Sequence, residues 1–186
     1  FPNDLEMAQK LSKRAIELDS HCQYAQWSRA YSCYLVRDRE QFVQLARLAI
    51  NLNPADTNIL AAAGQKLAMA GNWEEGLDLM RQAERLNPFL PSWFRTATFI
   101  YHLHNNDMEA ALAEARRINS PQTAGYMFRC ALLGAMGRKE EAALELQELL
   151  SKWPSFAGNY QEILRRIVFQ DSIKDILVKG LQNAGI

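Results

Sequence analysis

The sequence predicts an all-α chain in which pairs of helices stack in a row, and three observations support this prediction. A proline-containing marker recurs at a nearly constant interval along the 186-residue chain. Between these markers, a short turn followed by a small residue also recurs. The apolar residues between the markers fall on one face of an α-helix. A fixed period of this kind is the signature of a repeat architecture.

The proline marker ends each period. Its four copies are Asn51–Pro54, Arg85–Pro88, Ile118–Pro121 and Ser151–Pro154. Successive prolines are therefore separated by about 34 residues, which lies within the range of known helical repeats. Proline disfavours helical geometry in the residue before it, so each marker predicts the end of a helix.

The second marker divides each period into two helices. Its copies are Gly71–Leu77, Asn106–Leu112 and Gly137–Ala143. We expect Gly71 to end the first helix of its period with a positive φ. We also expect Gly64 and Gly76 to let the two helices of that period approach closely, because a larger side chain would overpack the contact.

Together these features resemble the tetratricopeptide repeat, a helix–turn–helix unit of about 34 residues. Residues 57–90 give the fullest match, carried by Leu60, Ala63, Gly64, Leu67, Gly76, Met80, Ala83 and Pro88. Residues 123–156 also match, except that Arg129 stands where a large apolar residue is usual. Residues 91–122 insert one residue before the turn and shorten the second helix, and residues 23–56 match more by spacing than by residue type. The resemblance implies a right-handed superhelix of paired helices.

Both ends of the chain depart from the full repeat. In residues 1–22, Ala8, Ser12 and Ala15 fall on second-helix positions, so we expect the second helix of a truncated repeat and a longer parent protein. The alternative is a capping helix at a native start. Residues 157–186 are expected to form a helical cap over the last repeat. Their final helix resembles the tails of bacterial tetratricopeptide regions attached to adenylate cyclases or to winged-helix transcriptional regulators.

Composition limits the classes of function. Lys plus Arg and Asp plus Glu both number 21, so the formal net charge is zero and direct nucleic-acid binding is disfavoured. The sequence lacks the ~20 consecutive apolar residues of a membrane span. The three cysteines are odd in number and form no CxxC pair, which favours a reducing, cytoplasmic location.

No motif points to catalysis, a metal or a cofactor. His102 and His104 lie two positions apart on a predicted helix, so they point in different directions and cannot bind one metal ion. Acidic pairs such as Glu74 and Glu75 fall in the first turns of second helices. There their negative charges interact favourably with the positive end of the helix dipole, which is a structural role. We therefore expect a module without enzymatic activity of its own, and we expect any catalytic activity to lie in a missing upstream domain.

The resemblance implies that the first helices line a concave groove. Carried onto this sequence, the residues expected there are Tyr24, Trp27, Tyr31, Tyr34, Asn58, Gln65, Met69, Arg95, Phe99 and His102. Four large aromatic side chains on one helix face are typical of a binding surface. The alternative is that further repeats, or the interior of the superhelix, cover them as core. The family's Lys, Arg and Asn clamp for peptide carboxylates is not reproduced.

These observations favour a non-enzymatic module that binds a protein segment or another domain of its own chain. It would be the regulatory or scaffold part of a larger bacterial signalling or transcription-regulatory protein. One alternative is a small-molecule sensor for an upstream cyclase or DNA-binding effector, with a closed pocket among Tyr34, Met69, Phe99 and His102. The other is a homodimerisation platform.

Overall fold

A computed structural model describes residues 2–118 and 124–186. Within them the chain forms eleven α-helices and one 3-10 helix, and no β-strand, as the helical periodicity predicts. The marker residues Asn119–Pro121 and the repeat boundary between residues 122 and 123 lie outside the described residues. The chain divides into two compact units, residues 1–90 and 91–186, and each is described by itself.

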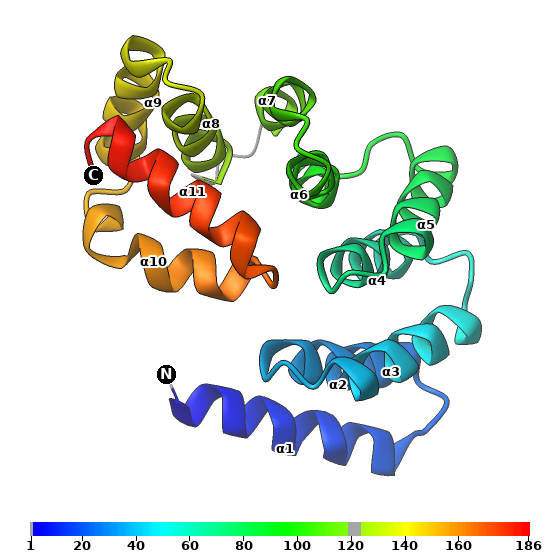
Figure 1. The fold of residues 1–186 in the computed structure, drawn as a ribbon. Coiled ribbons are helices and arrows are strands. Elements are labelled where there is room, and N and C mark those ends of the chain that lie inside the picture. Colours follow the sequence, from blue (N-terminus) through cyan, green and yellow to red (C-terminus); the bar gives the residue numbers. More distant parts are fainter. Residues whose placement is uncertain (1, 119–123) are drawn as a thin grey trace. The chain divides into compact units, whose positions relative to one another are not determined.

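Unit 1 contains two antiparallel helix pairs preceded by a single helix (Figure 1). Its helices are α1 (Pro2–Leu18), α2 (Gln23–Leu35), α3 (Arg39–Leu52), α4 (Thr57–Met69) and α5 (Trp73–Leu86). α2 pairs with α3 and α4 pairs with α5, while α1 packs against α2 and α3 packs against α4. Each helix therefore covers an apolar face of the helix beside it in the chain.

Unit 2 contains two further pairs and two closing helices. Its elements are η1 (Ser92–Arg95), α6 (Thr96–His104), α7 (Met108–Arg117), α8 (Ala124–Ala135), α9 (Lys139–Lys152), α10 (Phe156–Ile167) and α11 (Asp171–Ala184). α7 has 10 residues, whereas α3, α5 and α9 each have 14, so the second helix of residues 91–122 is short. α11 packs against α8 and covers it as a cap.

The turn inside each helix pair has the same backbone geometry. A left-handed residue ends the first helix at Arg37 (φ 64°), Gly71 (φ 95°), Asn106 (φ 57°) and Gly137 (φ 74°). The amide of the next residue then donates to a carbonyl five positions back, with N···O distances of 2.9–3.0 Å. This arrangement pairs carbonyls that the end of a helix leaves unsatisfied, and it reverses the chain.

The α4–α5 contact depends on two glycines. A Cβ added to Gly64 would lie 2.7 Å from the Gly76 carbonyl oxygen, and one added to Gly76 would lie 2.5 Å from the Gly64 carbonyl oxygen. Both distances are shorter than any normal contact, and backbone cannot rotate away as a side chain can. The two helices therefore touch backbone to backbone.

Arg129 shows how a charged residue occupies an apolar position of the repeat. Its Nε donates to Glu145 Oε1 at 2.7 Å, which joins α8 to α9. Its guanidinium carbon lies 4.6 Å from the centroid of the Tyr126 ring. The aliphatic stem supplies the packing that a large apolar residue would give, and the ion pair and the ring satisfy the charge.

We predict that Gly76→Ala lowers the free energy of unfolding, because the new methyl group must push α4 and α5 apart. The matched control is Gly158→Ala in α10, where nothing lies within 4 Å of an added Cβ. Both changes favour the helical state equally, so their difference isolates the packing cost, expected at about 1–3 kcal/mol. Urea denaturation measures both values, and equal stabilities would show that the helices tolerate separation.

Candidate functional site

Three aromatic side chains form a row along one face of α2, here called the aromatic row: Trp27, Tyr31 and Tyr34. Their spacing of four and three residues places them on adjacent turns of the helix. The ring centroids of Trp27 and Tyr31 lie 6.1 Å apart with planes 25° from parallel. Those of Tyr31 and Tyr34 lie 6.1 Å apart with planes 11° from parallel.

The aromatic row runs from the surface into the core of unit 1. Tyr31 is 40% exposed and Tyr34 only 3% exposed. The Tyr34 ring meets Phe42 of α3 edge-on, with centroids 5.2 Å apart. Burial raises the pKa of both tyrosines, so their hydroxyl groups stay neutral and can donate hydrogen bonds. The buried end therefore fixes the row, and the outer end is accessible.

Lys66 of α4 adds a cation to the aromatic row. Its Nζ lies 5.3 Å from the centroid of the Tyr34 ring and 5.8 Å from that of Tyr31. Burial among these rings lowers the pKa of Lys66 to about 8. Lys66 was not among the residues expected in the groove, because the resemblance does not direct its position of the repeat into it.

We predict that Lys66 titrates near pH 8 in the folded protein, against an ordinary value of 10.5. The unfolded chain then holds the proton more tightly, so the stability contributed by this group rises from pH 8 to 10.5 and levels off above. An NMR titration of the Lys66 ε-carbon gives the midpoint. Tyr31→Ala admits water and should move it toward 10.5. A wild-type midpoint already at 10.5 would contradict the burial.

A groove of about 460 Å³ lies between α1 and α2. We call it the α1–α2 groove. Its α1 wall consists of Ala8, Leu11, Ser12 and Ala15, and its α2 wall of Trp27, Ser28, Tyr31, Ser32 and Leu35. The outer end of the aromatic row is thus also one wall of this groove. The α1 wall was not among the expected site residues.

The other expected residues of unit 1 have different surroundings. Tyr24 is 57% exposed and its hydroxyl donates to Asp56 Oδ2 at 2.9 Å, while Asn58 is exposed. Gln65 and Met69 are 3% and 1% exposed. These last two side chains belong to the packed interior and present no surface to a partner.

The expected residues of unit 2 likewise do not form one surface. Arg95 Nη1 donates to Glu114 Oε2 at 3.2 Å, which joins η1 to α7. Phe99 is fully buried, with its ring centroid 4.5 Å from that of Phe128. His102 is half-buried beside Tyr101. Phe99 is therefore core, and the structural role of Arg95 is to pair with a buried carboxylate.

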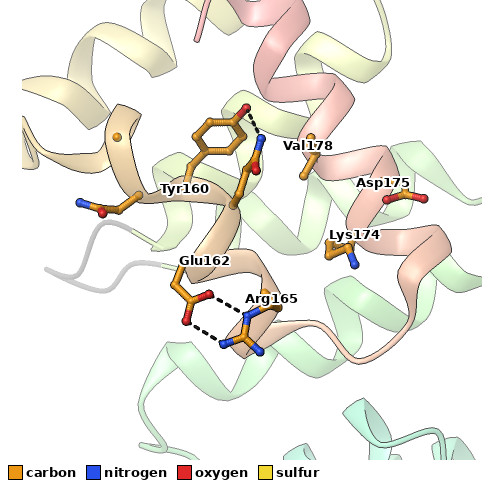
Figure 2. Close-up of a pocket in the computed structure, with 9 residues that line it drawn as sticks. Tyr160, Glu162, Arg165, Lys174, Asp175 and Val178 are labelled. Atoms are coloured by element: carbon orange, nitrogen blue, oxygen red, sulfur yellow. Dashed lines mark hydrogen bonds and ion pairs between the residues drawn. The ribbon is translucent and has the colours of Figure 1, made fainter. Parts of the chain in front are cut away.

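A second hollow, of about 750 Å³, lies between α10 and α11 (Figure 2). Glu162 accepts from Arg165 at 2.7 and 2.8 Å and from Arg166 at 2.8 Å. Lys174 donates to Asp171 at 2.6 Å. These opposite charges offset one another, so the hollow has little electrostatic preference for a ligand.

We predict that the Glu162 carboxyl group titrates near pH 2, because its hydrogen bonds from Arg165 and Arg166 lower its pKa to about 2 from 4.5. The pairing is complete above pH 4.5 and is lost as the pH falls through 2. Carboxyl-carbon NMR gives the midpoint. Replacing both arginines with Gln should return it toward 4.5. High salt should do so in part, because the pairs are exposed.

Neither a metal centre nor a membrane span is found in the described ranges. Among residues 2–118 and 124–186, no three His, Cys, Asp or Glu side chains are grouped so that they could hold a metal ion. Over the same residues, no helix has both the length and the apolar character needed to cross a bilayer.

The comparisons with known proteins show a likeness to solved structures. No protein-family model and no curated protein matches the chain. Among solved structures, it is similar to that of YrrB, described as a TPR protein with an unusual peptide-binding site. The two share 15% identity over 93% of this chain and 90% of the other, with a TM-score of 0.55. This chain has the tetratricopeptide-repeat fold.

At 15% identity the likeness extends to the fold and not to the residues of any site. The repeat fold that residues 57–90 predict most clearly is therefore confirmed. The likeness of the last helix to tails of cyclase-linked or winged-helix proteins stays a prediction. Within the tetratricopeptide-repeat fold, the α1–α2 groove and the outer end of the aromatic row bring exposed apolar and aromatic side chains together in unit 1.

Proposed function

We propose that this protein is a non-enzymatic interaction module in which unit 1 binds a protein segment over the aromatic row and the α1–α2 groove. The observation that supports this most strongly is the distribution of exposed apolar side chains. Among the described residues, seven of the eleven large apolar side chains that are exposed lie between positions 7 and 36: Met7, Leu11, Leu18, Tyr24, Tyr31, Leu35 and Val36. Three of them, Leu11, Tyr31 and Leu35, line the α1–α2 groove, and exposed apolar side chains gathered around a groove are typical of interaction surfaces.

The residue types and the rigidity of the aromatic row also favour tight binding. Trp and Tyr are the residue types that contribute most binding energy at protein interfaces. Here the stack and the contact between Tyr34 and Phe42 hold the rings before any partner arrives. Because fewer rotamers are lost on binding, the entropic cost of association is reduced.

A protein or peptide partner fits this surface better than the other classes considered. The printed description of YrrB attributes a peptide-binding site to that protein, which supports a similar class of partner here. The balance of 21 cationic and 21 anionic residues disfavours nucleic acid. The small-molecule alternative stays a prediction, because its four residues are divided between unit 1 (Tyr34 and Met69) and unit 2 (Phe99 and His102).

The sequence also supports a proposal about the larger protein and its location in the cell. We propose that the module is the regulatory or scaffold part of a larger bacterial signalling or transcription-regulatory protein, supported by the likeness of its last helix to such tails. A cytoplasmic location is supported by the three cysteines, Cys22, Cys33 and Cys130, which are unpaired. A homodimer through the same apolar surface is the second candidate, since zero net charge gives no general repulsion between copies.

We predict that replacing both Trp27 and Tyr31 with Ala weakens binding of a partner segment by about 2 kcal/mol or more, because both rings lose buried contact area. The readout is fluorescence anisotropy with peptides selected from a random dodecapeptide display library. The control is Phe89→Ala, which removes an aromatic ring that is 89% exposed and lies outside the site. Equal affinities for the double variant and the wild type, with helicity retained in both, would exclude this surface.

A further inference from the structure

The last helix of unit 2 does not continue the row of helix pairs. In the regular arrangement the first helix of a pair packs against the second helix of the pair before it, as α4 packs against α3 and α8 against α7. α11 instead packs most closely against α8, with smaller contacts to α6 and α9. Because α6 and α8 are both first helices, α11 lies on the side of unit 2 that the first helices form.

The contact between α8 and α11 is made backbone to backbone. A Cβ added to Gly180 of α11 would overlap the carbonyl oxygen of Ala131, and one added to Gly134 would overlap the carbonyl oxygen of Gly180. Asn183 Nδ2 also donates to the Gly134 carbonyl oxygen at 3.2 Å. We call the surface of α8 formed by Ala131, Gly134 and Ala135 the α8 face. It holds a helix that has a glycine where the two helices cross.

The rest of the buried surface of α11 is apolar. Besides Gly180, the buried residues of this helix are Ile173, Leu177 and Leu181. Their spacing places all four on one side of the helix. The ligand of the α8 face is thus an amphipathic helix with three large apolar side chains and one glycine in its buried stripe.

The α8 face is equivalent to the side of α2 that carries the aromatic row. Ala131 and Gly134 precede the left-handed residue of their turn by six and three positions. Tyr31 and Tyr34 precede the left-handed residue of their own turn by the same intervals. Equivalent positions therefore carry large rings in one first helix and the two smallest residue types in the other. The small side chains leave room for a second helix directly against α8.

On its other side, α11 lines the hollow of about 750 Å³ that separates it from α10 (Figure 2). Lys174, Asp175 and Val178 are the α11 residues that line it. α10 is anchored separately, because Phe156 is fully buried and its ring centroid lies 5.3 Å from that of Trp153. The packing of α11 is therefore mainly with α8, and little of it is with the helix that precedes it in the chain.

The connection between α10 and α11 is short and extended. Only Val168, Phe169 and Gln170 join the two helices. The backbone is extended at Val168 (φ −106°, ψ 124°) and at Gln170 (φ −84°, ψ 120°). A short connection of this kind favours exchange of the terminal element between copies, because the exchanged element makes the same contacts in the second copy.

We propose that the α8 face is a helix-binding site, and that α11 from a second copy of this chain occupies it by exchange. In the exchanged dimer each α8 holds the α11 of the other copy through the same glycine contact. The contacts given up are those between α10 and α11, which the hollow keeps few. The zero net charge gives no general repulsion between copies. This inference concerns unit 2 and does not depend on the proposed function of unit 1.

The test is a complementation experiment with two variants of the whole chain. Gly180→Leu prevents its α11 from docking, because the new side chain overlaps the backbone of α8. Gly134→Leu prevents its α8 face from receiving any α11, for the same reason. The intact α11 of the Gly134→Leu chain nevertheless fits the intact α8 face of the Gly180→Leu chain. Joint refolding should give a complex of twice the chain mass in light scattering, which neither variant gives alone.

The matched control is Gly158→Leu in α10, where nothing lies within 4 Å of an added Cβ. This chain fills its α8 face with its own tethered α11. At micromolar concentration it should therefore form at least about tenfold less complex with Gly180→Leu than Gly134→Leu does. A synthetic peptide of residues 171–184 tests the face without a second copy. It should bind the Gly180→Leu chain in fluorescence anisotropy, whereas the same peptide with leucine in place of its glycine should not.

The wild-type chain should be a monomer at micromolar concentration and should form the exchanged dimer near the ~millimolar effective concentration of a short tether. Where a variant does not fold alone, joint refolding should restore its helicity in circular dichroism. Absence of the complex, of restored helicity and of peptide binding would overturn the proposal. A wild-type monomer at millimolar concentration would overturn the exchange. So would a wild-type dimer that the Trp27 and Tyr31 double variant abolishes, because it would assign association to unit 1.

Discussion

The whole architecture depends on a backbone constraint, the left-handed residue that ends the first helix of each pair. At that residue the chain leaves the helix, pairs carbonyls of the last turn and reverses. Two of the four positions hold glycine, which adopts this conformation freely, and Arg37 and Asn106 hold it at a cost of about 1–2 kcal/mol for the non-glycine residue. The cost is offset because the reversed helix buries an apolar face.

Once the chain reverses, small residues determine how closely the helices approach. Gly64 and Gly76 bring α4 and α5 into backbone contact, and Gly134 and Gly180 do the same for α8 and α11. Close approach leaves little space for voids, so each helix covers the face beside it efficiently. α2 packs against α3 and α4, and together with α1 it lines the α1–α2 groove.

The distribution of charge also distinguishes the aromatic row from the rest of the surface. Many surface charges are paired locally, as in the bidentate contact of Arg47 with Glu75 that joins α3 to α5. Such exposed pairs add little stability, and they leave little net field around them. Lys66 differs, because its ammonium group lies against two aromatic rings and its pKa is lowered by burial. The aromatic row therefore combines aromatic rings with a partly desolvated cation, in a protein whose cationic and anionic residues are equal in number.

The sequence by itself determined the helical class, the repeat period, the turn at Gly71 and the close contact of Gly64 with Gly76. Each of these follows from residues near one another in the chain, where spacing fixes which side chains share a face. Only the tertiary structure decided that Met69 and Phe99 are core, that Arg95 pairs with Glu114, and that Lys66 reaches the rings of α2. Periodicity defines the faces of a helix, but which face stays open depends on the neighbouring helices that pack against it.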